Sequence, residues 1–211
     1  TSVSRGLGDV YKRQLIISNQ DKRQKIDLNT LQLIENDYVL IAEETYDPPT
    51  TSLDENGQGI PYAIYGYGAQ MAEITVDTEL GLLKIDKITA AHDLGKTINP
   101  LLAEGQIEGG IAQGIGFALM EEYIPSKTEN LHDYLIPSIG DVPEIESILI
   151  EKNDPEGPFG ARGLGEHVLI PTAPAIMNAL RNATGAIITK LPALPDRILE
   201  AIEISKNGSN K

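Results

Sequence analysis

The most regular pattern of hydrophobic positions runs through residues 99–123, NPLLAEGQIEGGIAQGIGFALMEEY. Its apolar residues recur at helical spacing: Ile107, Ile111, Ile115 and Ala118. A stripe of this kind is typical of the buried face of an amphipathic helix. Asn99 followed by Pro100 is typical of a helix start, since asparagine caps the first turn and proline suits the first helical position. The pattern therefore predicts a long helix that begins at Pro100.

Mixed or alternating hydrophobic and polar positions predict strands in four other places: 38–43, 67–76, 82–90 and 145–151. The second and third strands are joined by the turn sequence TELG, which predicts a β-hairpin. Segments rich in proline, glycine and aspartate at 47–59 and 125–143 predict irregular crossings.

Two further helices are predicted near the end of the chain. One begins at Thr172 and ends at a glycine cap, Gly185, and a shorter one covers 195–202. Because strands and helices do not alternate strictly and no repeat is found, the fold class is α+β: mixed strands, a glycine-rich helix and C-terminal helices.

The two ends of the chain are treated separately. Residues 1–14 match neither a helical nor a strand period, so we expect a sequencing-adaptor-derived or disordered extension outside the fold. Residues 15–204 are expected to form the folded region, and residues 205–211 a frayed tail. The chain does not begin with methionine, and we expect it to be part of a longer subunit.

Composition limits the class of partner. The chain has 17 basic and 31 acidic residues and a net charge of −14, which argues against nucleic acid and anionic membrane as partners. No apolar run reaches the length needed to span a bilayer. Since cysteine is absent, the chain can hold neither a thiolate-ligated iron–sulfur cluster nor a disulfide. Electrons from any redox reaction would have to leave through another chain.

The predicted long helix carries more glycine than a plain surface helix tolerates, since each glycine inside a helix costs about 1 kcal/mol relative to alanine. Its candidate ligand-binding residues are Gln106, Gly109, Gly110, Gln113 and Gly114. Of these, the first four are expected to face away from the isoleucine stripe. One interpretation is that another helix packs closely against the glycines. The other is a ligand rich in oxygens, bound by the glutamine amides and backbone N–H groups, and the heptad spacing of the glutamines favours it.

A second dense glycine stretch, GPFGARGLGE, covers residues 157–166. Glycine permits positive φ angles and close approach of the backbone to another group. The candidates for ligand contact in this loop are Gly160, Ala161, Arg162 and Gly163. A carboxyl group positioned by such a loop is suited to act as a general base, which makes Glu166 the catalytic candidate. The alternative is a glycine-rich turn that ends in a solvated glutamate.

The chain has three histidines: His92, His132 and His167. None lies at metal-ligand spacing from another, so no residue is predicted to bind a metal directly. His167 follows Glu166 and could tune its proton affinity, although an exposed neighbour is the favoured interpretation. Arg162 could contact a phosphate or an anionic substrate, or could pair with Asp154 or Glu156, and both interpretations stay open.

Several ordered motifs stand at compatible spacing: DLGKTINP at 93–100, GQIEGGIAQGIG at 105–116, DYLIP at 133–137, DVP at 141–143 and the glycine loop at 160–166. Together they resemble the xanthine oxidase family of molybdenum hydroxylases, in the C-terminal part of the large molybdopterin-binding subunit. The resemblance covers about residues 38–202, nearly all of the sequence that is expected to fold.

The resemblance implies a cofactor and a reaction. The cofactor is Mo-molybdopterin, in bacteria usually the cytosine dinucleotide form. The reaction is a water-derived hydroxylation of an electron-poor carbon in an N-heterocycle or an aldehyde, with a glutamate as general base. Glu166 matches that glutamate, and Gln106 matches the glutamine that reaches the cofactor from the glycine-rich helix. Arg162 stands where many relatives have lysine, which leaves the local charge unchanged.

The resemblance also implies partners. We expect 2Fe–2S clusters and FAD on partner chains or domains, iron–sulfur and flavin subunits, and an upstream part of the same subunit that completes the cofactor site. A small-molecule substrate and a bacterial, cytoplasmic location are expected as well. Two alternatives remain: a reductive relative acting on aromatic acyl-CoA substrates, and a non-catalytic partial chain that serves only as a packing module.

Overall fold

The structure is a computed structural model that describes residues 5–9, 13–19, 22–34 and 38–208. The chain divides into two compact units, 1–47 and 48–211. The boundary therefore falls near residue 47, and the prediction of one folded region that starts at residue 15 is wrong. Within the described residues, no helix combines the length and the apolar character needed to cross a membrane.

The first unit is a small antiparallel sheet in the order β1-β2-β3. Its strands are β1 (Arg5–Asp9), β2 (Gln14–Asn19) and β3 (Lys22–Asp27), followed by the 3₁₀ turn η1 (Leu28–Thr30). The prediction that residues 1–14 contain no strand is wrong over β1, which gains its hydrogen bonds by pairing with β2. The origin of this segment stays a prediction.

The strand predicted at 38–43 is also absent, and these residues are irregular. The side chains of Tyr38, Leu40 and Ile41 are all more than half exposed. Mixed polar and apolar positions produce a strand only where a neighbouring strand accepts its backbone hydrogen bonds. No strand among the described residues pairs with this segment, which explains the difference.

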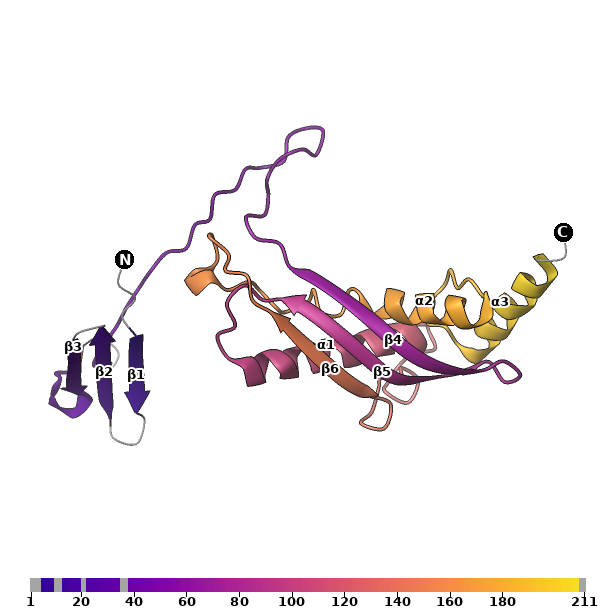
Figure 1. Cartoon of the computed structure of the whole chain (residues 1–211), viewed down its shortest axis with the longest axis horizontal. Helices are drawn as coiled ribbons and strands as arrows, with labels where there is room; N and C mark the ends of the chain where they lie inside the picture. The colour runs from indigo at the N-terminus through magenta and orange to yellow at the C-terminus, as the bar shows by residue number, and fades with distance from the viewer. Residues whose placement is uncertain (1–4, 10–12, 20–21, 35–37, 209–211) are drawn as a thin grey trace. The chain divides into compact units, whose positions relative to one another are not determined.

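The second unit is built on a mixed sheet in the order β4-β5-β6 (Figure 1). β4 (Tyr67–Asp77) and β5 (Leu82–Asp93) form the predicted antiparallel hairpin, and β6 (Glu144–Ile150) lies parallel to β5. A parallel pair needs a crossover connection, and α1 (Pro100–Leu119) lies within it. The α+β class is confirmed.

The ends of α1 and α2 follow the predicted signals. The side chain of Asn99 accepts a hydrogen bond from the N–H of Leu102 at 3.2 Å, and Pro100 occupies the first turn. α2 (Thr172–Thr184) ends at Gly185, whose φ of 76° suits glycine.

α3 (Pro195–Gly208) is longer than predicted. Residues 205–208 of the expected frayed tail are helical, while 209–211 lie outside the described residues. Ser205 packs against the cap of α2: a Cβ added at Gly185 would lie 2.8 Å from the Ser205 hydroxyl. This contact between helices gives the extra turn a partner that sequence periodicity does not show.

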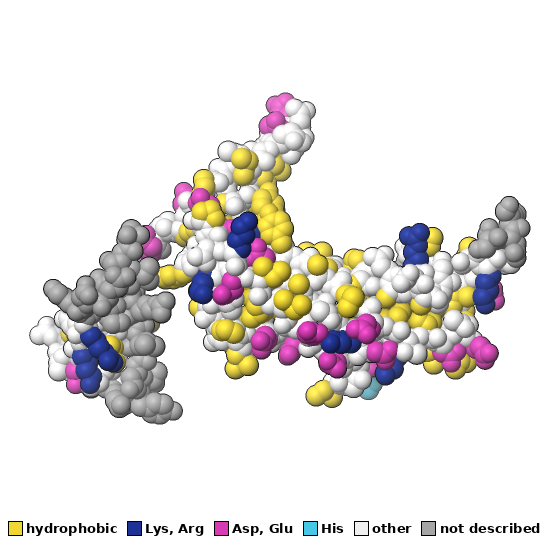
Figure 2. Space-filling view, in the orientation of Figure 1, with side chains coloured by type: hydrophobic (Ala, Val, Ile, Leu, Met, Phe, Trp, Pro, Cys, Tyr) yellow, Lys and Arg dark blue, Asp and Glu magenta, His cyan; other side chains and the backbone are white. Residues whose placement is uncertain are grey.

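Large hydrophobic side chains are also left on the surface of the second unit. Figure 2 shows hydrophobic side chains spread over the visible face of this unit. The most exposed of them are Ile139, Phe159, Leu101, Leu102 and Leu131.

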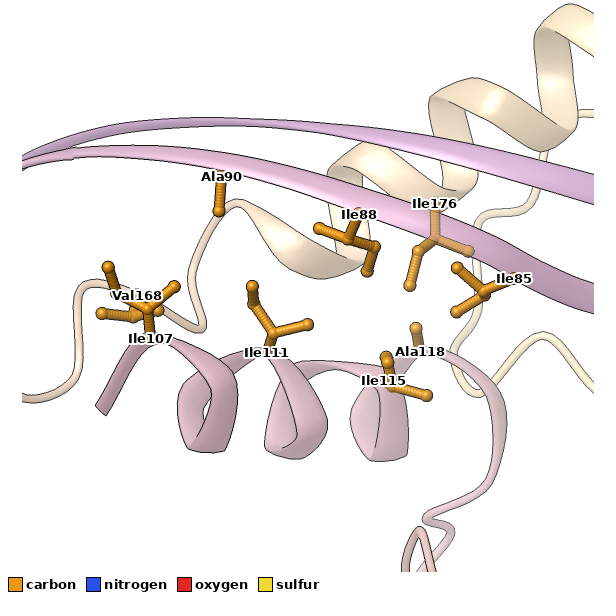
Figure 3. Packing of buried hydrophobic residues seen from close by; sticks show 9 residues of the cluster. All are labelled: Ile85, Ile88, Ala90, Ile107, Ile111, Ile115, Ala118, Val168 and Ile176. Atoms are coloured by element: carbon orange, nitrogen blue, oxygen red, sulfur yellow. The ribbon is translucent and has the colours of Figure 1, made fainter. Parts of the chain in front are cut away.

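The main core lies between α1, β5 and the start of α2 (Figure 3). It contains the isoleucine stripe predicted for α1, and its buried members are Ile85, Ile88, Ala90, Ile107, Ile111, Ile115, Ala118, Val168 and Ile176. α1 and α2 therefore cover the same face of the sheet. The core places the first turns of α1 beside the segment 163–168, which carries the catalytic candidate.

Candidate cofactor site

The predicted glycine loop lies where β5 and β6 end. Because the two strands are parallel, the chain leaves both at the same edge of the sheet. The N–H of Lys96 donates to the Gly160 carbonyl at 2.7 Å, and the N–H of Arg162 donates to the Leu94 carbonyl at 2.7 Å. These bonds join the loop after β6 to the corner after β5.

The first half of the loop is held by its own hydrogen bonds. The carboxylate of Asp154 accepts from the N–H groups of Glu156 and Gly157 at 2.9 and 3.1 Å. The N–H groups of Gly160 and Ala161 donate to carbonyls within the loop at 2.8 and 3.0 Å. These N–H groups are therefore already paired, and the cofactor contact of Gly160 and Ala161 stays a prediction.

Close approach explains one glycine of the adjoining corner. Gly95 has a φ of 63°, and a Cβ there would lie 2.3 Å from the carbonyl oxygen of Gly160. Only glycine fits this contact without movement of the loop.

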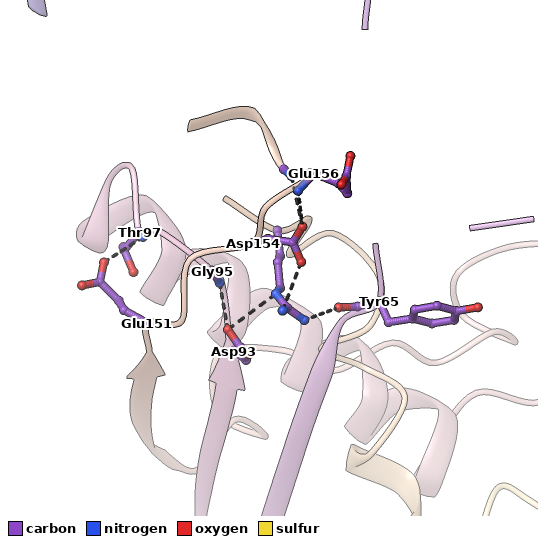
Figure 4. Close-up of polar contacts among 9 residues, drawn as sticks. Tyr65, Asp93, Gly95, Thr97, Glu151, Asp154 and Glu156 are labelled. Carbon is purple, nitrogen blue, oxygen red and sulfur yellow. Dashed lines mark hydrogen bonds and ion pairs between the residues drawn. The ribbon is translucent and has the colours of Figure 1, made fainter. Parts of the chain in front are cut away.

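The side chain of Arg162 is buried inside the protein. One terminal nitrogen lies 3.0 Å from Asp154, and Nε lies 3.9 Å from Asp93. The other terminal nitrogen donates to the Tyr65 carbonyl at 2.9 Å, and the guanidinium lies 5.2 Å from the ring centre of Tyr67. Figure 4 shows the dashed contacts of Asp93, Asp154 and Tyr65 that meet at this group. The Asp154 interpretation is therefore correct. Nε has no hydrogen bond among the described residues, and a phosphate or substrate contact of Arg162 stays a prediction.

The glycines of α1 separate into two sets, which the sequence interpretation had combined. Gly110 and Gly114 are buried, and a Cβ there would lie 2.9 Å from Val168 and 2.5 Å from Thr172. They belong to the packed face, so the prediction that Gly110 turns away from the isoleucines is wrong. A direct ligand contact of Gly110 and Gly114 is not supported either. Gly110 comes three residues after Ile107 and beside Ile111, a spacing that already indicated the packed face.

An open set of glycines remains on the other side. A Cβ added at any of these would meet nothing within 4 Å: Gly105, Gly109, Gly163 and Gly165. The amide of Gln106 donates to the Gly165 carbonyl at 3.2 Å, which joins α1 to the segment that carries Glu166. Gln113 and Glu166 are both exposed. The structure thus brings Gln106, Gly109 and Gly163 to the neighbourhood of Glu166, and adds Gly165, the second glycine of the Gly-x-Gly-Glu sequence.

A pocket of about 370 Å³ adjoins this open set. Its lining is mainly apolar and includes Leu94, Leu102, Ala103, Gln106, Ala161, Arg162, Leu164 and Gly165. A larger depression of about 610 Å³ lies over β4 and α2, but it contains none of the predicted site residues. The pocket beside Gln106 is the one that belongs to the site, since the loop and α1 both line it.

The histidines occupy three different environments. His92 is fully buried, and burial, followed by repulsion from His167, lowers its pKa from 6.5 to about 4. His167 is half-buried with its ring centre 5.1 Å from that of His92, and burial lowers its pKa, so the favoured interpretation of an exposed neighbour is wrong. His132 is exposed. The part of the chain that the structure describes holds no group of three or more His, Cys, Asp or Glu side chains arranged to bind a metal ion.

Known proteins with the same motifs were found by sequence. Residues 9–143 match the family described as a molybdopterin cofactor-binding domain. The xanthine dehydrogenase molybdenum-binding subunit of Escherichia coli O157:H7 is 41% identical over 145 residues, which cover 66% of this chain and 19% of that protein. The aldehyde oxidoreductase of Megalodesulfovibrio gigas is 42% identical over 152 residues, which cover 70% of this chain and 16% of that protein.

Solved structures agree. The aldehyde oxidoreductase from Desulfovibrio gigas superposes with a TM-score of 0.70 at 41% identity, over 73% of this chain and 17% of that one. Quinoline 2-oxidoreductase from Pseudomonas putida superposes with a TM-score of 0.59 at 36% identity, over 63% and 18%. The chain thus spans less than a fifth of the length of these relatives. Together, the matched family, the sequence identities and the superpositions show that the chain belongs to the xanthine oxidase family, within its molybdopterin cofactor-binding region.

Proposed function

We propose that this chain is part of the molybdenum-dependent catalytic subunit of a hydroxylase, with Glu166 as its general base. The observation that carries the proposal is the hydrogen bond from Gln106 to the Gly165 carbonyl. It joins the open glycine face of α1 to the residue directly before Glu166. One carboxylate, one amide and a backbone free of side chains therefore border the same surface.

The residues present fit a molybdopterin cofactor. Gly105, Gly109, Gly163 and Gly165 leave their backbone uncovered, so a bulky group rich in phosphate and carbonyl oxygens can approach closely. The exposed amide of Gln113 can donate or accept hydrogen bonds one heptad from Gln106. When bound, the cofactor supplies the two-electron redox chemistry and the transfer of oxygen derived from water.

The contribution of the chain is positioning and proton transfer. Glu166 accepts the proton that is released as the new carbon–oxygen bond forms, which requires its carboxylate to be ionised. Gln106 holds the backbone of the loop, so the carboxylate stays beside the cofactor face. The substrate class we propose is an electron-poor carbon of an N-heterocycle or an aldehyde. The proposal is supported by relatives named as xanthine dehydrogenase, aldehyde oxidoreductase and quinoline 2-oxidoreductase.

We further propose how the subunit is completed. Since the chain has no cysteine, 2Fe–2S clusters lie on partner chains or domains. FAD on such partners accepts the electrons from the clusters. The remaining cofactor contacts come from the other parts of the subunit, because the chain spans 16–19% of the length of its relatives. The cytosine dinucleotide form of the cofactor and a cytoplasmic, bacterial location are part of the same proposal.

The test is Glu166→Gln in the full-length holoenzyme, which keeps the shape of the side chain and removes the proton acceptor. We expect kcat to fall at least ~10²-fold while the molybdenum content stays normal, because a general base acts on the chemical step. The matched control is Glu203→Gln, on an exposed turn of α3. Normal molybdenum content with near-normal turnover in Glu166→Gln would remove Glu166 from the mechanism.

A further inference from the structure

The segment that follows Glu166 is bound to the sheet by a buried polar network. The side-chain amide of Gln70, on β4, donates to the Val168 carbonyl at 2.8 Å. The hydroxyl of Thr172 donates to the side-chain oxygen of Gln70 at 2.8 Å. The nitrogen of the same Gln70 amide lies 3.3 Å from Nε2 of His92 on β5. Gln70 therefore joins two points of the segment 167–172 to a buried histidine.

The hydrogen-bond pattern assigns the proton on His92. The bonds to Val168 and Thr172 fix which end of the Gln70 amide is nitrogen, and its second hydrogen points to Nε2 of His92. Nε2 is then the acceptor, and the neutral ring carries its proton on Nδ1. In a charged ring Nε2 would also carry a proton and would face the N–H of Gln70, which is unfavourable. This agrees with the lowered pKa of His92. Gln70 therefore pairs with a neutral His92, whose Nδ1 has no hydrogen-bond partner among the described residues.

His92 in turn supports the residue directly after Glu166. The ring centres of His92 and His167 lie 5.1 Å apart at an angle of 51°. Two glycines leave room for the rings, Gly66 directly before β4 and Gly68 on β4. A Cβ at Gly66 would lie 2.7 Å from Nδ1 of His167, and one at Gly68 would lie 2.4 Å from Nδ1 of His92. The ring pair is therefore enclosed by backbone, which limits its movement.

These contacts act on one side of Glu166. On its other side stands Gly165, which has a wide choice of backbone conformations and whose carbonyl accepts one side-chain hydrogen bond, from Gln106 at 3.2 Å. On the network side, the N–H of Leu169 donates to the Glu166 carbonyl at 3.2 Å, and Val168 is fully buried. A base within a flexible glycine loop must be held at the productive geometry by surrounding residues.

We propose that Gln70 and His92 are positioning residues for Glu166, acting through Val168 and His167. The inference rests on the proposed role of Glu166, since only then does the position of its carboxylate affect turnover. Neither residue touches the open glycine face, so neither is a catalytic residue.

The first experiment needs no cofactor. In the 211-residue chain, Gln70→Leu should speed the amide hydrogen exchange of Leu169 at least tenfold, while the amide of Ile111 in α1 stays protected. The matched control is Thr75→Val, also on β4, which removes a side-chain hydrogen bond of 2.6 Å to Asp86 on the solvent face. Equal exchange at Leu169 in Gln70→Leu and Thr75→Val would overturn the proposal.

The second experiment is a double-mutant cycle in the full-length holoenzyme. Gln70→Leu alone should lower kcat about tenfold with unchanged molybdenum content, and should have no further effect in the Glu166→Gln background. A general structural role would instead reduce kcat by the same factor in both backgrounds, which contradicts the proposal. Where Gln70→Leu does not fold, Thr172→Val removes only the hydroxyl donor to Gln70 and carries the same two tests.

The outcomes separate the two hypotheses. If Glu166→Gln keeps its turnover, the proposed function fails, and the exchange result still reports on the network. If Glu166→Gln is inactive while Gln70→Leu changes neither kcat nor exchange, the positioning role fails and the general base stands.

Discussion

At the scale of the residue, burial decides the role of a charged side chain more than its position in a motif does. Arg162 stands in the glycine loop beside the catalytic candidate, which favoured an anion contact as much as a structural pair. Its side chain is only 11% exposed, and the carboxylates of Asp93 and Asp154 are 13% and 8% exposed. A buried cation between two carboxylates has its charge paired by them, and it pairs their charges in the same way.

Removing this cation should destabilise the chain strongly. We expect Arg162→Met to lower the free energy of unfolding by about 3–5 kcal/mol, because Asp93 and Asp154 would be left buried and unpaired. The control is Lys96→Met, which removes an exposed pair with Glu151 and should change stability by about 1 kcal/mol or less. Urea unfolding of both variants gives the comparison. Equal losses would contradict the structural role of Arg162.

The buried histidine should make stability depend on pH. The pKa of His92 is about 4 in the folded chain and 6.5 in the unfolded chain, so the unfolded state binds the proton first as the pH falls. Stability should therefore decrease from pH 7 to pH 5, by about 2 kcal/mol from this group. The lowered pKa of His167 acts in the same direction.

The measurement is the unfolding free energy of the chain at several pH values in that window. His92→Phe should flatten the dependence, while His132→Phe, at an exposed position outside the network, should leave it unchanged. An equal slope in the original chain and in His92→Phe would contradict the assignment of a neutral, buried His92.

At the scale of the element, α1 serves two purposes on two faces. One face packs its isoleucines together with Gly110 and Gly114 against the core, and the other leaves Gly105 and Gly109 open. The physical reason for a glycine at these positions differs between the two faces. On the packed face a Cβ would collide with Val168 or Thr172, whereas on the open face no atom of this chain excludes one.

The two faces predict opposite effects of the same substitution. Gly109→Ala should raise the stability of the chain by up to about 1 kcal/mol, because alanine favours helix and its Cβ meets nothing. Gly110→Ala should lower it by about 1–3 kcal/mol, since its Cβ would lie 2.9 Å from Val168. Thermal unfolding of the two neighbouring variants tests this. In the full-length subunit, Gly109→Ala should also weaken cofactor retention, which a purely structural glycine would not do.

At the scale of the whole molecule, the chain has a hydrophobic core and one candidate site. It spans 16–19% of the length of its relatives, and it leaves large hydrophobic side chains such as Leu101, Leu102 and Ile139 exposed. The described part of the site contributes a glycine face, two amides and a carboxylate. A cofactor that is enclosed on just one side makes few of the contacts that give tight binding.

The chain purified alone should therefore hold much less than one molybdenum atom per molecule. Metal analysis by mass spectrometry measures this, with the full-length subunit expressed in the same cells as the control. Stoichiometric molybdenum in the 211-residue chain would show that this region is sufficient to bind the cofactor.

The sequence by itself determined the features that depend on near neighbours. The hairpin of β4 and β5, the asparagine cap of α1 and the glycine cap of α2 all follow from spacings of a few residues. The ordered motifs also led to the family, and to Gln106 and Glu166 as neighbours in one site. The bond from Gln106 to Gly165 brings Gln106 to the residue directly before Glu166, while the roles of both stay predictions.

Only the tertiary structure decided the features that depend on distant partners. β1 forms because β2 pairs with it. Residues 38–43 form no strand because no described strand pairs with them. Gly110 is packed because Val168, 58 positions later, lies against it. The Arg162 side chain has protein partners because Asp93 and Tyr65 reach it from another part of the chain. Local periodicity limits which face a residue occupies, but contacts made across the fold decide whether that face is covered.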